Sequence, residues 1–228
     1  MQLLSNRRET PTTRTIRVSL DGRPFPYKAG QAAWLGVDPH GELTPYSIAS
    51  APDETRRHGW LQFLVKVDAA RRFGAVVESL RKGAEIYVGG PAGAFTFPDT
   101  PPEHEFLFVA GGTGIAPVRS MVLHALEATK APIIRVLYSA RQPNEFAYLG
   151  ELRALARAGR IALELTLTGE GGRWRYGRGR AGAAHLSRLG AGPSTLAFLC
   201  GPGAMVADLS SALESLGVPS RNIRTEQW

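Results

Sequence analysis

The chain has 228 residues and a formal net charge of +7, from 27 basic and 20 acidic side chains. Hydrophobic residues make up 43% and charged residues 21% of the sequence, which excludes a disordered or fibrous protein and is typical of one large globular domain or two compact ones. The single cysteine, Cys200, excludes an internal disulfide framework and a cysteine-ligated zinc or iron–sulfur centre.

Metal and membrane sites are not expected. The five histidines are scattered along the chain, with no pair at helical spacing. The longest apolar stretch, from Phe106 to Val118, is broken by three glycines and a threonine and is too short to span a bilayer. We therefore expect no metal site and a soluble, cytoplasmic protein.

Residues 1–98 predict short β-strands separated by glycine, proline and aspartate turns, a pattern typical of a small antiparallel barrel or sandwich. The expected strands are Thr15–Leu20, Ala32–Val37, Trp60–Val67 and Glu85–Val88. Between the second and third of them, Tyr46 and Ser47 place an aromatic ring beside a hydroxyl on an expected strand edge that exposes both. Such a pair could stack on a planar ring and donate a hydrogen bond to it, although tyrosine and serine in strands are more often core or surface residues.

A cluster of prolines at Pro98, Pro101 and Pro102 interrupts any helix or central strand. We place a domain boundary there, with residues 1–98 in the first domain and 103–228 in the second. Beyond it, apolar strands alternate with segments of helical periodicity, which predicts a doubly wound α/β domain with a five-stranded parallel sheet. Its strands are expected at Phe106–Ala110, Ile133–Tyr138, Ile161–Leu167, Leu196–Cys200 and near Asn222–Gln227.

A glycine-rich turn follows the first of these parallel strands. Gly111, Gly112 and Gly114 surround Thr113, and Pro117 lies in the expected first turn of the next helix. Glycines let the backbone approach phosphates, and the unpaired N–H groups of a helix N-terminus attract an anion. The turn predicts a pyrophosphate site; the alternative is a tight strand-to-helix turn without a ligand.

A second loop of the same kind favours the ligand interpretation. Gly201, Pro202 and Gly203 follow Cys200 at the end of another apolar strand, and Met205 lies at the start of an amphipathic helix. Ligands of doubly wound sheets bind at the carboxyl ends of the strands where the strand order reverses, so the two loops could flank one crevice. A free cysteine, taken alone, is more often a buried small hydrophobic residue.

Six motifs occur in a characteristic order, and together they cover essentially the whole chain. They are Gly30-Gln31, Tyr46–Ser50 (YSIAS), Gly89–Gly93 (GGPAG), Gly111–Pro117 (GGTGIAP), Cys200–Met205 (CGPGAM) and the C-terminal aromatic Trp228. This order resembles that of the ferredoxin–NADP reductase superfamily. The resemblance implies an N-terminal antiparallel flavin-binding β-barrel, a C-terminal NAD(P)-binding domain, and an FAD-dependent NAD(P)H oxidoreductase that passes electrons to a separate acceptor.

Carried over position by position, the resemblance implies roles for single residues. Tyr46 matches the tyrosine that packs on the isoalloxazine ring, and Ser47 matches the hydroxyl near flavin N5. Ser47, Cys200 and Glu226 match the serine, cysteine and acid around the hydride-transfer site of many members, so these three are the expected catalytic residues. The expected cofactor-binding residues are Tyr46, Ser47, Ile48, Gly90, Pro91, Gly93, Gly111, Gly112, Thr113, Gly114, Pro117, Arg141, Cys200, Gly201, Pro202, Met205 and Trp228.

Two positions depart from the family pattern. Thr44 occupies the position where the pattern has an arginine that binds the flavin phosphate. Val77 occupies the position of a hydroxyl residue that contacts the pyrophosphate. The missing arginine removes a charge-assisted contact of about 1.5–3 kcal/mol. Lys66, Arg71 and Arg72 lie nearby in sequence and could substitute. We expect FAD as the flavin, with FMN as the alternative.

The choice between NADH and NADPH stays open. NADPH-selective relatives often carry Ser-Arg after the third strand, where this chain has Thr168-Gly169. An arginine-rich segment follows, and it could either meet a 2′-phosphate or form a solvated loop. Its members are Arg173, Arg175, Arg178 and Arg180.

The electron acceptor is expected to be a separate molecule because the chain carries no cysteine cluster. Candidates are ferredoxin, flavodoxin, an oxygenase component or free flavin, and the positive charge favours an acidic electron carrier through electrostatic steering. Neither nucleic acid nor a membrane is expected as a partner. The alternative function is a non-catalytic binding or regulatory subunit that keeps the fold but holds flavin weakly, which Thr44 and Val77 would favour.

Overall fold

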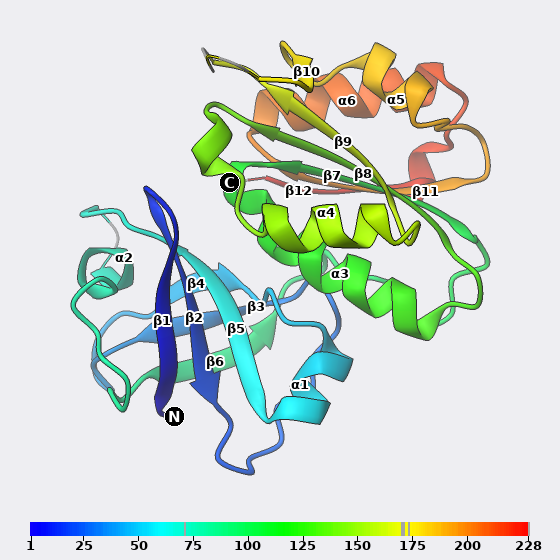
Figure 1. The fold of residues 1–228 in the computed structure, drawn as a ribbon. Helices are drawn as coiled ribbons and strands as arrows, with labels where there is room; N and C mark the ends of the chain where they lie inside the picture. Colours follow the sequence, from blue (N-terminus) through cyan, green and yellow to red (C-terminus); the bar gives the residue numbers. More distant parts are fainter. Residues whose placement is uncertain (71, 170–171, 173, 228) are drawn as a thin grey trace.

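The computed structural model describes residues 1–70, 72–169, 172 and 174–227. The expectations for Arg71, Arg173 and Trp228 therefore lie outside the described residues. The chain forms an antiparallel N-terminal half and an α/β C-terminal half (Figure 1). Among the described residues, no helix combines the length and the apolar character needed to cross a membrane.

The N-terminal half is a closed antiparallel barrel, as the sequence predicts. Two three-stranded sheets have the orders β1-β2-β5 and β4-β3-β6. Bridges between Ile48 and Phe63 and between Gln2 and Glu85 join the two sheets along both edges and close the barrel. The elements are β1 (Leu3–Thr10), β2 (Thr13–Ser19), β3 (Ala32–Gly36), β4 (Thr44–Ser47), α1 (Pro52–His58), β5 (Trp60–Lys66), α2 (Arg72–Val76) and β6 (Tyr87–Ala92).

The C-terminal half is a parallel sheet covered by helices on both faces, which confirms the predicted doubly wound fold. The sheet order is β10-β9-β8-β7-β11-β12, one strand more than the five predicted, because the two-residue β10 pairs with β9. The strands are β7 (Glu105–Gly111), β8 (Ile133–Ala140), β9 (Ala162–Leu167), β10 (Gly177–Arg178), β11 (Thr195–Gly201) and β12 (Ile223–Gln227). The helices are α3 (Ile115–Ala128), α4 (Leu149–Arg157), α5 (Ala183–Arg188) and α6 (Gly203–Ser215).

The strand order reverses between β7 and β11. These two strands are parallel neighbours, with Ala110 opposite Cys200 in the register. Their carboxyl ends therefore lie side by side, and the two glycine-rich loops that follow them meet at one edge of the sheet. This edge faces the barrel (Figure 1).

Aromatic packing joins the two halves near the proline cluster. The Phe97 ring is 2% exposed and lies 5.0 Å from the Phe106 ring and 5.6 Å from the Phe198 ring, between centroids. The segment before Pro98 is thus anchored in the core of the second half. We propose that the domain boundary lies in the loop after Phe97, as the prolines suggest.

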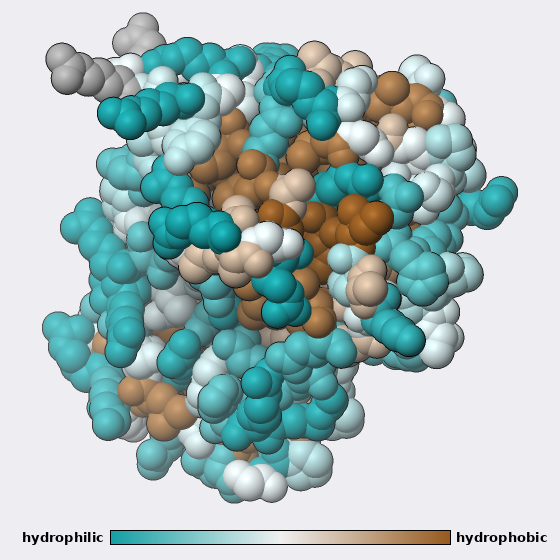
Figure 2. All heavy atoms as spheres, turned by 45° about the vertical axis from the view of Figure 1, so that its right-hand side comes forward, coloured by the Kyte–Doolittle hydropathy of each residue, from teal (hydrophilic) through white to brown (hydrophobic). Residues whose placement is uncertain are grey.

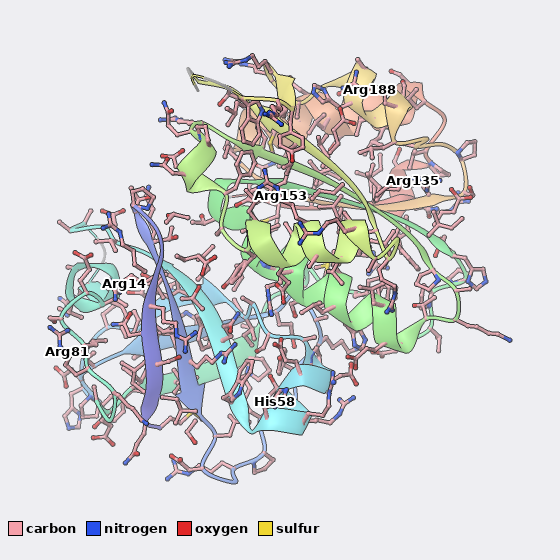
Figure 3. All side chains as sticks on the ribbon, viewed as in Figure 1. Arg14, His58, Arg81, Arg135, Arg153 and Arg188 are labelled. Atoms are coloured by element: carbon pink, nitrogen blue, oxygen red, sulfur yellow. The ribbon has the colours of Figure 1, made fainter. Side chains whose placement is uncertain are left out.

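The surfaces of the two halves differ. On the face shown in Figure 2, apolar side chains gather over the α/β half, and hydrophilic side chains cover most of the barrel. Basic side chains occur on both halves, as Arg14 and Arg81 on the barrel and Arg135 and Arg188 on the α/β half illustrate (Figure 3).

Candidate active site

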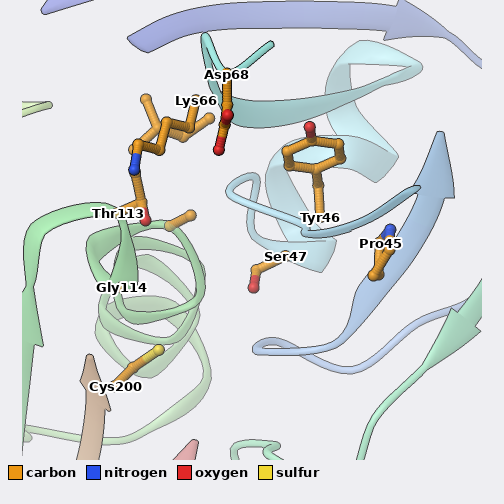
Figure 4. Close-up of a pocket in the computed structure, with 10 residues that line it drawn as sticks. Pro45, Tyr46, Ser47, Lys66, Asp68, Thr113, Gly114 and Cys200 are labelled. Atoms are coloured by element: carbon orange, nitrogen blue, oxygen red, sulfur yellow. The ribbon is translucent and has the colours of Figure 1, made fainter. Parts of the chain in front are cut away.

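A pocket lies between the barrel and the edge of the parallel sheet, and neither half forms it alone (Figure 4). The barrel contributes residues of β4 and β5, and the α/β half contributes the first glycine loop and the end of β11. The lining residues are Pro45, Tyr46, Ser47, Leu64, Lys66, Asp68, Thr113, Gly114, Ala116 and Cys200. The structure therefore brings together Tyr46, Ser47 and Cys200, which lie far apart in the sequence.

The two motif residues of β4 are oriented differently. Tyr46 is 8% exposed, and its ring packs in the barrel core, 5.8 Å from the Phe73 ring. Ser47 is half-buried, and its hydroxyl points into the pocket (Figure 4). The expectation that both side chains are exposed is wrong for Tyr46, because successive side chains point to opposite faces of a strand. Tyr46 forms a wall of the pocket, whereas Ser47 presents a polar group to it.

Cys200 and Glu226 lie next to each other because β11 and β12 pair in parallel with these residues in register. The Cys200 Sγ donates a hydrogen bond to Glu226 Oε2 at 3.7 Å. Burial and the neighbouring carboxylate raise the pKa of the Cys200 thiol, and burial raises the pKa of Glu226. A reactive thiolate, which a helix N-terminus alone could favour, is therefore disfavoured here, and the pair can hold a proton beside the pocket.

The two glycine loops pack directly against each other. A Cβ atom on Gly114 would lie 2.3 Å from the carbonyl oxygen of Cys200, and one on Gly201 would lie 3.2 Å from Gly111 Cα. Gly112 has a φ of 53°, in the left-handed region that favours glycine. Close backbone contact between the loops is thus a reason for these glycines that the sequence did not reveal.

Tyr138 holds the first loop in place. Its buried hydroxyl donates a hydrogen bond to the carbonyl oxygen of Gly112 and accepts one from the backbone N–H of Ala147, each at 3.1 Å. Burial raises the pKa of this phenol well above its usual range, so the hydroxyl stays a donor in alkaline solution as well as at neutral pH.

A larger cleft of about 770 Å³ adjoins the pocket. Six predicted cofactor-binding residues line it: Gly111, Gly112, Thr113, Arg141, Pro202 and Met205. Three basic residues, Lys66, Arg141 and Arg180, share its walls with two acidic ones, Glu145 and Asp208. Its size is within the usual range for small-molecule sites, and the loops at its floor suit an anionic ligand.

The pocket and the cleft are continuous. Leu64, Lys66 and Thr113 line both cavities. The side chain of Lys66 extends from β5 toward Thr113 (Figure 4). A ligand in the pocket and a second ligand in the cleft would therefore meet at these three residues.

Several predicted residues lie elsewhere. Ile48 is fully buried in the barrel core, and Pro117 is buried in the first turn of α3. Gly90, Pro91 and Gly93, at β6 and just after it, are not among the described residues that line either cavity. Gly201 also lines neither cavity, and for all of the predicted residues cofactor contact stays a prediction.

Sequence reasoning missed a group of threonines. Thr10, Thr12 and Thr13, at the turn between β1 and β2, line the cleft. No local signal identifies them, because they reach the cleft only through the packing of the barrel hairpin against the α/β half.

The pocket fits the ring system of a flavin better than its phosphates. Tyr46, Ser47 and Leu64 provide an apolar wall with one hydroxyl. Val77, at the position expected to contact a pyrophosphate, is fully buried in the barrel core. Among the described residues that line the pocket, Lys66 is the basic one, and it is the side chain that would hold a flavin phosphate.

Comparisons with known proteins agree with this geometry. Residues 108–211 match the family model of the oxidoreductase NAD-binding domain. The chain is 36% identical over 220 residues to ferredoxin–NADP reductase B of Sorangium cellulosum, covering 91% of this chain and 88% of that protein. It is 31% identical over 229 residues to the ferredoxin–NAD(P)(+) reductase component of the naphthalene 1,2-dioxygenase system of Pseudomonas putida, covering 96% of this chain and 66% of that protein.

A solved structure gives the same fold. A ferredoxin NADP+ reductase from Neisseria gonorrhoeae with bound FAD and NADP superposes with a TM-score of 0.80 at 21% identity. The match covers 99% of this chain and 96% of that one.

Proposed function

Because the chain belongs to the ferredoxin–NADP reductase superfamily and is an FAD-dependent NAD(P)H oxidoreductase, we propose that it delivers electrons to a separate, acidic electron-carrier protein such as a ferredoxin. The similarity to a ferredoxin–NADP reductase carries this proposal. The continuity of the pocket and the cleft supports the step before it, since a flavin ring beside Ser47 and a nicotinamide nucleotide on the glycine loops would meet at Thr113. The net charge of +7 supports an acidic partner.

Each part of the chain has its own task in this proposal. When bound, FAD accepts a hydride from the nicotinamide and returns the electrons to an acceptor. Tyr46 forms the wall against which the ring packs, and Ser47 donates a hydrogen bond to it. The glycine loops bind the pyrophosphate of the nucleotide. Cys200, kept protonated beside Glu226, packs against the nicotinamide and helps to exclude water.

The test compares possible acceptors with one donor. Flavin reduction by NADH or NADPH is followed anaerobically in a stopped-flow instrument, and cytochrome c reduction is then measured with an acidic [2Fe–2S] ferredoxin or with free FMN. We expect the ferredoxin to support the faster rate, and this rate to fall as ionic strength rises, because salt screens steering between opposite charges. A ferredoxin rate no faster than the FMN rate would contradict the proposed acceptor.

A further inference from the structure

A buried arginine connects the two halves behind the pocket. Arg119, in the second turn of α3, is 4% exposed. Its Nη1 donates to the carbonyl oxygen of Ala49 at 2.7 Å and to Glu54 Oε2 at 3.0 Å, and its Nη2 donates to Glu54 Oε1 at 3.2 Å. Its Nε and Nη2 donate to Glu151 at 2.6 and 2.8 Å. Ala49 and Glu54 belong to the barrel half, and Glu151 belongs to α4.

Every N–H group of this guanidinium has an acceptor. Arginine has five such groups in a rigid planar fork, so one arrangement of the three partners satisfies them all. Separating the halves would leave a buried charge without its acceptors, which is far more costly than losing an exposed ion pair. The cluster therefore favours one relative position of Ala49, Glu54 and α3.

Neighbouring contacts extend the same junction. Ser120, the next residue on α3, donates its hydroxyl to the carbonyl oxygen of Ser50 at 2.7 Å. One to two turns further along α3, His124 Nδ1 lies 2.7 Å from Asp53 Oδ2. Helices α1 and α3 are thus bound along their length, from the segment that follows Ser47 to the middle of α3.

The junction lies between two parts of the candidate active site. Ala49 and Ser50 follow Ser47 closely in the chain, and their carbonyl groups are held by α3. The N-terminus of the same helix begins at the glycine loop that lines both cavities. A shift of α3 relative to residues 49–50 would therefore change the distance between Ser47 in the pocket and the first glycine loop.

We propose that Arg119 is a positioning residue for hydride transfer, which fixes the Ser47 segment of the barrel relative to the glycine loop of the α/β half. This inference rests on the proposed location of the flavin at Tyr46 and Ser47. Reacting atoms must be held within a narrow distance, and a misplacement of about 1 Å can cost a hundredfold in rate. Removing Arg119 should therefore slow the hydride step more than it weakens the binding of either ligand.

The test compares Arg119→Met with Arg135→Met. Arg135 also forms an ion pair with a glutamate, Glu105, at 2.9 Å, but both residues belong to strands of the α/β half. Arg135 lies on the side away from the barrel (Figure 3). We expect Arg119→Met to slow flavin reduction at saturating NAD(P)H at least about tenfold while the KM changes less than about threefold. Arg135→Met should keep the wild-type rate.

A second readout does not depend on activity. Amide hydrogen exchange over residues 46–51 reports how often the backbone hydrogen bonds of this segment open. The N–H groups of Ile48 and Ala49 donate to the carbonyl oxygens of Gln31 and Gln62. Exchange there should accelerate about tenfold in Arg119→Met and stay unchanged in Arg135→Met. If Arg119→Met does not fold, Glu54→Gln and Glu105→Gln provide the matched pair, because Glu54 spans the junction and Glu105 does not.

Two results would overturn the inference. One is equal reduction rates in the Arg119 and Arg135 variants, and the other is unchanged exchange at residues 46–51 when Arg119 or Glu54 is replaced. Failure of the proposed function is distinguishable, because the wild-type protein itself would then not transfer electrons to the ferredoxin.

Discussion

The cleft proposed for the nucleotide and the pocket proposed for the flavin share the wall formed by Leu64, Lys66 and Thr113, but the rest of their linings differ. Both glycine loops contribute to the lining of the cleft, through Gly111, Gly112 and Pro202. Half of the ten residues that line the pocket belong to β4 and β5. Contacts made by backbone depend on a few glycines, whereas contacts made by side chains depend on the residue at each position.

The largest effect is expected from a side chain added at Gly114, where the two glycine loops touch. A Cβ on Gly114 would overlap the carbonyl of Cys200, so Gly114→Ala must separate the two loops. We expect a loss of about 1–3 kcal/mol in the free energy of unfolding, together with a higher KM for NAD(P)H. Denaturant unfolding and steady-state kinetics measure both. Gly150→Ala, at a helical position with open space around it, is the control. Wild-type stability and KM in Gly114→Ala would show that the loops do not need this contact.

The proposed flavin pocket can be tested by introducing the arginine that the family pattern has at position 44. Thr44→Arg places the family's arginine at the edge of β4, where a charge-assisted hydrogen bond to a flavin phosphate is worth about 1.5–3 kcal/mol. We expect FAD to bind about ten- to a hundredfold more tightly in a fluorescence titration. Riboflavin has no phosphate, so its affinity should not change. An equal increase in affinity for both flavins, or no increase for FAD, would contradict the idea that this pocket lacks a contact to the flavin phosphate.

The sequence predicted the features that local signals mark and missed those that depend on contacts between distant parts of the chain. The parallel strands and both glycine loops were predictable, because apolar runs and glycines are local signals. Strand β1 was missed because its middle, Ser5 to Glu9, is polar and partly exposed. Strand β10 has two residues and exists through its pairing with β9. The Arg119 cluster was also missed, because Glu54 is 65 residues away in the chain and no local pattern marks the pair.

A smaller effect is expected at Arg180, an exposed residue of the cleft lining. Arg180 lines the cleft, whereas Arg178 donates a hydrogen bond to the carbonyl oxygen of Gly172 and Arg175 is not among the described lining residues. If Arg180 meets a 2′-phosphate, Arg180→Ala should lower kcat/KM for NADPH about tenfold, which corresponds to about 1.4 kcal/mol, and leave NADH nearly unchanged. Arg175→Ala is the matched control. An equal loss with both nucleotides would mean that Arg180 does not discriminate between them.

The smallest effect concerns Glu226, which lies next to Cys200 beside the pocket. Burial raises the pKa of this carboxyl in the folded state, so the folded protein binds the proton more tightly than the unfolded chain does. The stability that this provides is complete below the unfolded pKa of about 4.3 and is lost as pH rises through the folded pKa. Glu226→Gln removes the ionisation, so its Tm relative to the wild type should rise from pH 4 to neutral pH, by about 1–2 °C.

The same variant tests the catalytic role assigned to Glu226. The amide oxygen that Glu226→Gln introduces can still accept the hydrogen bond of the Cys200 thiol, but the side chain can no longer exchange a proton. Flavin reduction by NAD(P)H should therefore slow and lose its dependence on this group in the pH profile, while the flavin stays bound. Cys200→Ser provides the comparison, since it keeps a hydrogen-bond donor beside an ionisable Glu226. A wild-type rate and pH profile in Glu226→Gln would leave the carboxyl a role in packing β12 against β11 and none in the hydride step.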